Sequence, residues 1–335
     1  MSGNLLEARG VSRTFGVGRT LLGHARHHVR ALDQVDLHLV KGETLGLVGE
    51  SGCGKSTLAR ILLALEKPTA GSVSFCGENL SSLSAPELRK RRRHLQMIFQ
   101  DPYASLNPRR VVRDSVAEPL HNFTDLGAEA IAARVDAAAA NVGLSPHHLD
   151  RFPHELSGGQ CQRVGLARAI APEPDLIIAD EPVSALDVSI QAQNLNLMMD
   201  IKARMGLAMI FVSHDLSIVA HVSDRVAVMY LGRIIETGPT PAVFAAPRHP
   251  YTQMLLGSAP HPLPQSRKRR SQVTGELPSP ISPPSGCHFR TRCPLASAQC
   301  ASEQPSLKEH FPNHMVACHR VPVTAQPAGE RLPHE

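Results

Sequence analysis

The first fifty positions alternate short apolar runs with turn-forming residues. The runs are LLEARGVSRTF, VRALDQVDLHLV and ETLGLVGE. This alternation predicts an antiparallel β layer that leads into a buried strand. The Gly- and His-rich segment between the first two runs, GVGRTLLGHARHH, predicts a loop, and the pattern assigns no role to its residues 24–28.

Helical spacing follows, with Leu58, Ile61, Leu62 and Leu65 on one face of STLARILLALE. Further helices are predicted around LRKRRRHLQ and AEAIAARVDAAAANVGL, which together indicate a helical insertion at about residues 85–165. The chain then returns to a strand LIIAD, a helix QAQNLNLMMDIKARM, a strand AMIFVSHD and a hairpin RVAVMYLGRIIETG. This order predicts an α/β fold with a parallel-sheet core, an antiparallel β subdomain and a helical subdomain.

Composition narrows the class of protein. Hydrophobic residues make up 42% of the 335 positions and charged residues 19%, which is typical of a soluble globular chain. No stretch reaches the roughly 18 uninterrupted apolar residues of a membrane-spanning helix, and the amino terminus lacks the apolar core of a secretory signal. The net charge of +5 is well short of a dedicated nucleic-acid binder, so no nucleic-acid partner is expected.

A phosphate-binding motif, the Walker A segment GESGCGKS, stands between the third apolar run and the first helix. Its glycines let consecutive backbone N–H groups converge on phosphate oxygens, and the helix N-terminus adds positive potential. Lys55 would reach the β and γ phosphates of ATP, the Ser56 hydroxyl would bind Mg²⁺, and Thr57 can bond a phosphate nearer the nucleoside. The predicted nucleotide site comprises Gly49, Glu50, Ser51, Gly52, Cys53, Gly54, Lys55, Ser56 and Thr57.

Two carboxylates, Asp180 and Glu181, end the apolar strand LIIAD. Phosphate sites assemble at the carboxyl ends of parallel strands, so Asp180 is expected to hold Mg²⁺ through water. Glu181 follows at once and is the candidate for polarising the water that attacks the γ phosphate.

A second glycine-rich segment, the signature LSGGQ, opens the predicted helix CQRVGLARAI. A helix that starts in this way offers backbone donors to a phosphate other than the one held by the chain's own Walker A turn. That arrangement requires two subunits. The donors would come from Ser157, Gly158, Gly159 and Gln160.

The ordered set GESGCGKS, Gln100, LSGGQ, LIIADEP, SALD and His214 resembles the nucleotide-binding subunits of ABC transporters, over roughly residues 5–250. The resemblance implies a P-loop ABC fold and a head-to-tail dimer with two ATP molecules between the subunits. It implies that Gln100 joins Mg²⁺ to the membrane subunit and that His214 contacts the γ phosphate. The D-loop that crosses the dimer interface would be Ser184, Ala185, Leu186 and Asp187.

An aromatic residue stacks on adenine in this family, and Phe15 is the candidate here. The chain departs from the family pattern at Cys161, where a basic residue or glutamine commonly follows the signature. We interpret Cys161 as a tolerated, partly buried thiol.

ABC proteins of DNA repair and translation keep the same ATP motifs, but one cassette without a heptad run favours transport. The segments FQDPYASLNPRRVV, PRHPYTQMLLGSAP and GCHFRTRCPLASAQC resemble dipeptide and oligopeptide importer ATPases, and among these the second of the two ATPase subunits. Importers of nickel, haem or other small solutes remain the alternative, because the ATPase does not touch the cargo.

The resemblance also implies the assembly. The partners would be a paralogous ATPase, in a heterodimer rather than a homodimer, two transmembrane permeases and an extracytoplasmic binding protein. The chain would be peripheral on the cytoplasmic face of the inner membrane. The expected division is an ATPase domain at 1–255, a Pro-rich arm at 256–286, a Cys-rich region at 287–320 and a disordered tail at 321–335.

Four of the seven cysteines lie in that Cys-rich region, at Cys287, Cys293, Cys300 and Cys318. Their spacing is irregular for a zinc ribbon, whose thiols come in tight pairs. Four thiolates also suit a [4Fe-4S] cluster, which the resembling permease subunits carry in this region. The cluster, zinc and free thiols all stay open, and a bound group would be structural or redox-sensing rather than catalytic.

Overall fold

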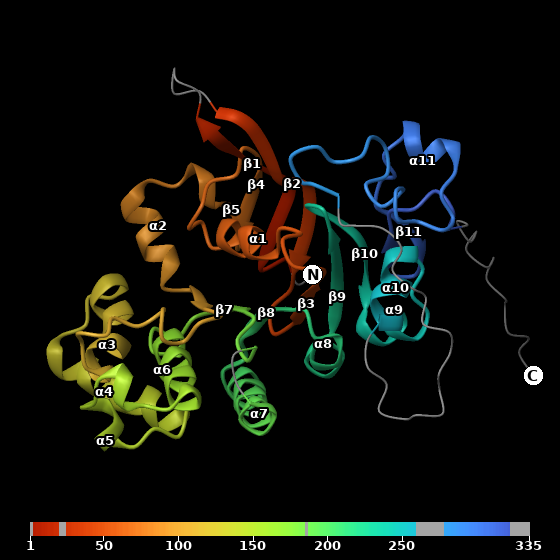
Figure 1. The fold of residues 1–335 in the computed structure, drawn as a ribbon. Helices are drawn as coiled ribbons and strands as arrows, with labels where there is room; N and C mark the ends of the chain where they lie inside the picture. Colours follow the sequence, from red (N-terminus) through yellow and green to blue (C-terminus); the bar gives the residue numbers. More distant parts are fainter. Residues whose placement is uncertain (1–2, 20–24, 185–186, 259–277, 322–335) are drawn as a thin grey trace, which may run out of the picture.

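The computed structural model describes residues 3–19, 25–184, 187–258 and 278–321 (Figure 1). Its strands form an antiparallel sheet in the order β2-β1-β4-β5 and a mixed sheet in the order β11-β12-β10-β9-β3-β8-β7-β6. The antiparallel sheet consists of β1 (Leu6–Arg19), β2 (Ala25–Leu39), β4 (Ala70–Phe75) and β5 (Glu78–Asn79). The mixed sheet consists of β3 (Thr44–Val48), β6 (Leu95–Ile98), β7 (Leu176–Asp180), β8 (Ala208–Ser213), β9 (Arg225–Tyr230), β10 (Arg233–Pro239), β11 (Lys308–Phe311) and β12 (His314–Val316).

The helices fall into a group that covers the mixed sheet and a group that packs on itself at the lower left of Figure 1. The first group is α1 (Lys55–Leu62), α7 (Val188–Met205), α8 (Leu216–Val222), α9 (Thr240–Ala245) and α10 (Pro250–Ser258). The second group is α3 (Val112–Phe123), α4 (Ala128–Asn141), α5 (Pro146–Leu149) and α6 (Gly158–Ile170), with α2 (Ala85–Arg92) above it. The short α11 (Ala298–Ser302) lies near the carboxyl end.

The central strands are buried on both faces. Along β7, Leu176 and Ile178 join a core with α1 and the antiparallel sheet, whereas Ile177 and Ala179 join a core with α6, α7 and α8. Because neither face of such a strand meets solvent, apolar residues are favoured at every position, which explains the uninterrupted apolar run LIIA. The parallel pairing of β3, β6, β7, β8 and β9 brings the carboxyl ends of these strands to one edge of the sheet.

The predicted loop GVGRTLLGHARHH is wrong over most of its length. β1 continues to Arg19 and β2 begins at Ala25, with Val17 opposite His27 and Gly16 opposite His28. Antiparallel pairing supplies the backbone hydrogen bonds here, so the glycines and histidines are held as strand despite their low strand propensity. Residues 20–24 lie outside the described part of the chain.

The helix predicted over LRKRRRHLQ is also too long. It ends at Arg92, and Leu95 begins β6, which pairs in parallel with β7. The buried position of β6 beside β7 overrides the helical propensity of its first residues. β6 therefore belongs to the mixed sheet, although it lies inside the segment 85–165 that the sequence assigns to helices.

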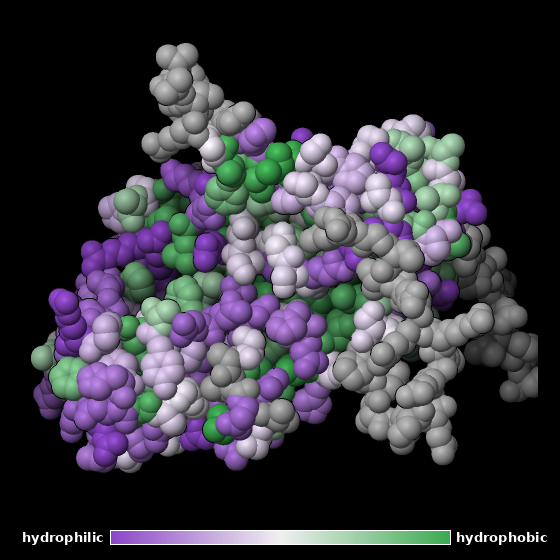
Figure 2. All heavy atoms as spheres, viewed as in Figure 1, coloured by the Kyte–Doolittle hydropathy of each residue, from purple (hydrophilic) through white to green (hydrophobic). Residues whose placement is uncertain are grey.

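The carboxyl-terminal residues continue the mixed sheet. β12 pairs with β10, Glu236 opposite Val316, and β11 pairs with β12. Most of the predicted arm (259–277) and nearly all of the predicted tail (322–335) lie outside the described residues. Within the described ranges, no helix has the length and apolar character that crossing a membrane demands. On the face shown in Figure 2, hydrophilic side chains cover most of α3 to α5, with small hydrophobic spots between them.

Candidate nucleotide-binding site

The Walker A segment forms a turn between β3 and α1 that only glycine can complete. Gly49 and Gly54 have φ angles of 155° and 108°. A Cβ atom on Gly49 would lie 2.3 Å from the Met229 carbonyl oxygen, and one on Gly54 would lie 2.4 Å from that of Ala31. The turn is therefore wedged between the backbones of β2 and β9, with no room for a side chain at either contact.

Lys55, the first residue of α1, is 6% exposed. Its Nζ donates hydrogen bonds to the carbonyl oxygens of Gly49 at 2.8 Å and Glu50 at 3.1 Å. The ammonium thus bonds neutral carbonyls of its own turn, and it can exchange them for phosphate oxygens without leaving the site. Burial raises the pKa of the neighbouring Cys53 thiol, which keeps it uncharged.

Ser56 and Asp180 meet beside the turn. The Ser56 Oγ donates to Asp180 Oδ1 at 3.2 Å, and Asp180 is 6% exposed at the end of β7. Burial raises the pKa of the Asp180 carboxyl, so its ionised form lacks solvation in this state. A hydroxyl beside an under-solvated carboxylate is an oxygen ligand pair that suits Mg²⁺.

Glu181 gathers two of the predicted residues around its carboxylate. Gln100 Nε2 donates to one oxygen at 2.9 Å, and His214 Nδ1 lies 3.2 Å from the other. The three residues follow β6, β7 and β8 at the same edge of the sheet. Glu181 also has a φ angle of 46°, so its backbone occupies the left-handed region that favours glycine.

The signature segment forms the capped start of α6. Ser157 Oγ accepts from the Gln160 N–H at 3.3 Å, and Gln160 Oε1 accepts from the Ser157 N–H at 2.9 Å. The first-turn N–H groups of Gly158 and Gly159 have no partner within the helix and can serve an anion. A Cβ on Gly159 would lie 2.7 Å from Ile190 Cγ2 of α7, so a larger residue does not fit. In Figure 1, α6 lies apart from α1, the helix that follows the Walker A turn.

The D-loop prediction is only partly described, because Ala185 and Leu186 lie outside the described residues. Ser184 is exposed and donates through Oγ to the Glu181 carbonyl at 3.0 Å. Asp187 caps α7 by accepting from the Ile190 N–H at 3.0 Å. The segment therefore starts at the carboxylate cluster and ends at a helix cap.

Phe15 lies in β1 opposite Val29 of β2. The guanidinium of Arg13 stacks over its ring at 4.6 Å from the centroid. Val29 is close in the strand to Ala31, whose carbonyl touches Gly54. The partly exposed ring thus belongs to the hairpin that borders the phosphate turn.

The four late cysteines lie in one neighbourhood. The Cys287 N–H donates to the Cys300 carbonyl at 2.8 Å. Burial raises the pKa of Cys287 to about 11, with smaller contributions from Cys300, Cys318 and Cys293. Within the described ranges, however, no three His, Cys, Asp or Glu side chains are arranged to hold a metal ion. Cys161 is fully buried, with its thiol 3.4 Å from the Pro153 carbonyl, rather than partly buried as predicted.

Two contacts with the Walker A turn were not predicted from the sequence. The Glu50 N–H donates to the Tyr251 hydroxyl at 3.0 Å, and the Glu50 carboxylate pairs with the Arg292 guanidinium. The partners are 201 and 242 residues away along the chain. Tyr251 stands in the peptide HPYTQ, which points to a family but not to a contact, and no motif marks Arg292.

Together, the mixed sheet, the glycine turn and the carboxylate cluster define an ATP-binding cassette ATPase. Residues 32–184 match the ABC transporter family, and residues 235–300 match the oligopeptide/dipeptide transporter C-terminal region. The chain belongs to the ATP-binding proteins of the oligopeptide and dipeptide ABC transporters. Such subunits use ATP and Mg²⁺ and couple ATP hydrolysis to transport.

Related proteins are similar in sequence to this chain over most of its length. The oligopeptide transport ATP-binding protein OppF of Salmonella typhimurium is 52% identical over 88% of this chain and 88% of its own. The dipeptide transport ATP-binding protein DppF of Haemophilus influenzae is 46% identical over 95% of this chain and 97% of its own. A dimeric, post-hydrolysis structure of the ATP-binding cassette MJ0796 with ADP and Pi has a TM-score of 0.62 and 28% identity, over 70% of this chain and 98% of that one.

Because the turn is packed between two strand backbones, we expect two alanine substitutions in it to lower the free energy of unfolding by different amounts. Gly52 has a φ angle of 78°, but a Cβ atom on it would meet no other atom within 4 Å, so Gly52→Ala should cost about 1 to 2 kcal/mol of unfolding free energy. Gly54→Ala adds the clash with the Ala31 carbonyl and should cost at least about twice as much. Urea unfolding of the full chain without nucleotide measures both. Equal losses would show that the turn is not held between the two strands.

Proposed function

We propose that this chain is the ATP-hydrolysing subunit of an importer of dipeptides or short oligopeptides. The observation that carries the proposal is the Glu181 carboxylate, held between Gln100 and His214 beside the Ser56–Asp180 pair. The names of the relatives support the peptide cargo. Nickel or another small solute is the alternative cargo, because none of these site residues would contact a transported solute.

The geometry suggests how the residues divide the reaction. Lys55 turns from its backbone carbonyls to the β and γ phosphates, while Ser56 and Asp180, with Gln100, would hold Mg²⁺, which would neutralise phosphate charge. Glu181 orients a water molecule and accepts its proton as the water oxygen attacks the γ phosphorus. His214 contacts the γ phosphate, and the bond to ADP breaks to leave ADP and inorganic phosphate.

Further residues are proposed to bind the adenine base and the phosphate nearest the nucleoside. Phe15 is proposed to stack on adenine, since its ring lies on the hairpin beside Gly54. Thr57 in the first turn of α1 is proposed to bond the phosphate nearest the nucleoside. The other proposed members of the site are the turn residues Gly49, Glu50, Ser51, Gly52 and Cys53, which form the backbone that borders the phosphates.

ATP is proposed to be shared between two subunits arranged head to tail. The signature residues Ser157 and Gly158 are solvent-accessible at the start of α6, and the Ser157 hydroxyl and the Gly158 N–H are available to a partner's γ phosphate. Ser184 and Asp187 are exposed at the proposed interface. The dimeric structure of the MJ0796 cassette with ADP and Pi supports association of two such subunits. The partner is proposed to be a paralogous ATPase.

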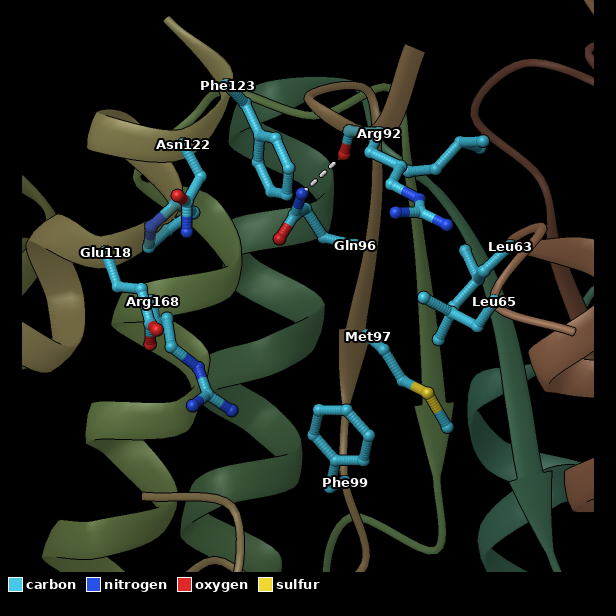
Figure 3. A pocket seen from close by; sticks show the side chains of 12 residues that line it. Leu63, Leu65, Arg92, Gln96, Met97, Phe99, Glu118, Asn122, Phe123 and Arg168 are labelled. Atoms are coloured by element: carbon cyan, nitrogen blue, oxygen red, sulfur yellow. Dashed lines mark hydrogen bonds between the residues drawn. The ribbon is translucent and has the colours of Figure 1, made fainter. Parts of the chain in front are cut away.

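A groove beside Gln100 is the proposed contact with a permease. It has a volume of about 200 Å³ and lies between α3 and β6, with Leu63 and Leu65 along its far side (Figure 3). Phe99 is 40% exposed and Leu65 is 49% exposed, so the groove offers apolar surface to a partner. Phe99 directly precedes Gln100, so a permease segment seated here can move the amide that bonds Glu181.

This contact would place the chain peripherally on the cytoplasmic face of the inner membrane. The complete importer would contain two permeases, the two ATPases and an extracytoplasmic peptide-binding protein. The proposed domain division keeps the ATPase unit at 1–255, followed by the arm and the Cys-rich region.

Cys287, Cys293, Cys300 and Cys318 are proposed to hold a [4Fe-4S] cluster. In addition to burial, Cys300 and Cys318 both contribute to raising the pKa of Cys287 and of Cys293, which supports a shared neighbourhood. A [4Fe-4S] cluster keeps its ligand sulfurs farther apart than a single tetrahedral ion does, so the lack of a single-ion site among the described residues is compatible with it. Cluster binding would deprotonate the thiols and stabilise the fold of this region.

Iron and sulfide analysis tests the cluster. Anaerobically purified wild-type chain should carry about four iron and four sulfide and absorb visible light, and Cys293→Ser should lose most of both. Cys76→Ser removes an exposed thiol in the turn between β4 and β5 and should leave the iron and sulfide contents unchanged. Colourless wild-type protein, or protein with stoichiometric zinc, would overturn this proposal.

Glu181→Gln tests the ATPase mechanism in the assembled importer. The amide cannot accept the proton from water, so kcat should fall at least about 100-fold while ATP binding is retained. Glu173→Gln is the matched control, since Glu173 is also a glutamate at positive φ but pairs with Arg134 outside the site. Undiminished turnover by Glu181→Gln would remove Glu181 from its catalytic role.

A further inference from the structure

The Cys-rich region packs directly behind the phosphate turn. Phe289 is 2% exposed and its ring lies 5.3 Å from that of Tyr230 and 5.5 Å from that of Tyr251, both edge-on. Tyr230 is the last residue of β9, and Tyr251 is the second residue of α10. An aromatic cluster of this kind fixes the position of the residues around it. The backbone that follows Phe289 is therefore held at a defined distance from β9.

Arg292 projects from this docked segment to the turn. Its Nη1 and Nη2 atoms lie 2.9 and 3.0 Å from the two carboxylate oxygens of Glu50. The Arg292 side chain is 4% exposed, and that of Glu50 is 27% exposed. A two-bond pair in this shielded position fixes direction as well as distance. The hydrogen bonds to Glu50 raise the pKa of the Arg292 guanidinium, so the charge is permanent.

Glu50 is the residue of the turn on which several contacts converge. Its N–H donates to the Tyr251 hydroxyl at 3.0 Å, and its carbonyl accepts from Lys55 Nζ at 3.1 Å. When Lys55 turns to a phosphate, the turn loses the contact with Lys55. The contacts from Tyr251 and Arg292 stay, and both come from residues beyond position 250.

We propose that Arg292 is a positioning residue for ATP, which holds the first half of the phosphate turn in its binding conformation through Glu50. The inference rests on the proposed ATPase function and adds a residue of the Cys-rich region to it. ATP affinity then depends on the docking of that region. The hydrolytic set of Gln100, Glu181 and His214 is untouched, so the rate at saturating ATP does not depend on Arg292.

A purely structural role predicts a different pattern. An ion pair that only stabilises the fold would lower the unfolding temperature and reduce the amount of active protein, which lowers apparent kcat and leaves KM unchanged. A positioning role raises KM for ATP and leaves kcat nearly constant. The two roles therefore separate in steady-state kinetics.

The test compares Arg292→Met, Arg292→Lys and Glu50→Gln in the assembled importer. Arg292→Met should raise KM for ATP about tenfold with kcat within about twofold, because a charge-assisted two-bond contact is lost. Arg292→Lys keeps the charge but not the paired geometry and should fall between wild type and Arg292→Met. The double variant Glu50→Gln/Arg292→Met should bind ATP no more weakly than Arg292→Met alone.

Arg290→Met is the matched control. Arg290 is the neighbouring arginine of the same segment, but its guanidinium bonds the Ser285 carbonyl and hydroxyl rather than the turn. It should leave KM unchanged. An unchanged KM in Arg292→Met, or fully additive effects in the double variant, would overturn the inference.

Affinity of the separate full-length chain for a fluorescent ATP analogue gives the same comparison without turnover. It keeps the two proposals apart. A wild-type importer that fails to hydrolyse ATP contradicts the proposed function, whereas equal analogue affinities of wild type and Arg292→Met contradict the role of Arg292. Should Arg292→Met not fold, Glu50→Gln must show the weaker binding alone, and normal binding by Glu50→Gln would overturn the inference.

Discussion

The close packing of the phosphate turn against two strand backbones is the contact on which the rest of the site depends. Gly49 lies against the Met229 carbonyl of β9, and Gly54 lies against the Ala31 carbonyl of β2. A phosphate needs several backbone N–H groups aimed at one point, and the chain can present them only where no side chain intervenes. The mixed sheet and the antiparallel sheet therefore meet at this turn, which places the proposed adenine-stacking hairpin and the phosphate site side by side.

Parallel pairing of the strands brings the other site residues together. Because β6, β7 and β8 end at the same edge, Gln100, Glu181 and His214 come together although more than 110 residues separate the first from the last. The signature belongs to α6 in the separate helical group, so the same topology keeps it away from its own turn. In the proposed arrangement a second subunit completes the active site, and opening or closing of that dimer would control hydrolysis.

The sequence predicted what depends on neighbouring residues and failed where distant contacts decide. The Walker A turn, the strand ending in Asp180 and the capped start of α6 were predictable, because each is a contiguous segment with a specific backbone requirement. The ends of the LRKRRRHLQ helix and of β1 were not, because pairing with β7 and β2 overrides local propensity. The Arg292–Glu50 and Tyr251–Glu50 contacts were not predictable either, since nothing local in a single sequence couples positions more than 200 residues apart.

The central claim is that ATP bound at this turn drives peptide uptake, and transport in cells tests it most directly. Uptake of labelled dipeptides and short oligopeptides would be measured in cells that lack the chain, and in the same cells supplied with wild type or Lys55→Ala, with nickel uptake followed in parallel. The account predicts that peptide uptake is lost without the chain, returns with wild type and does not return with Lys55→Ala, while nickel uptake stays constant. Unchanged peptide uptake together with lost nickel uptake would contradict it.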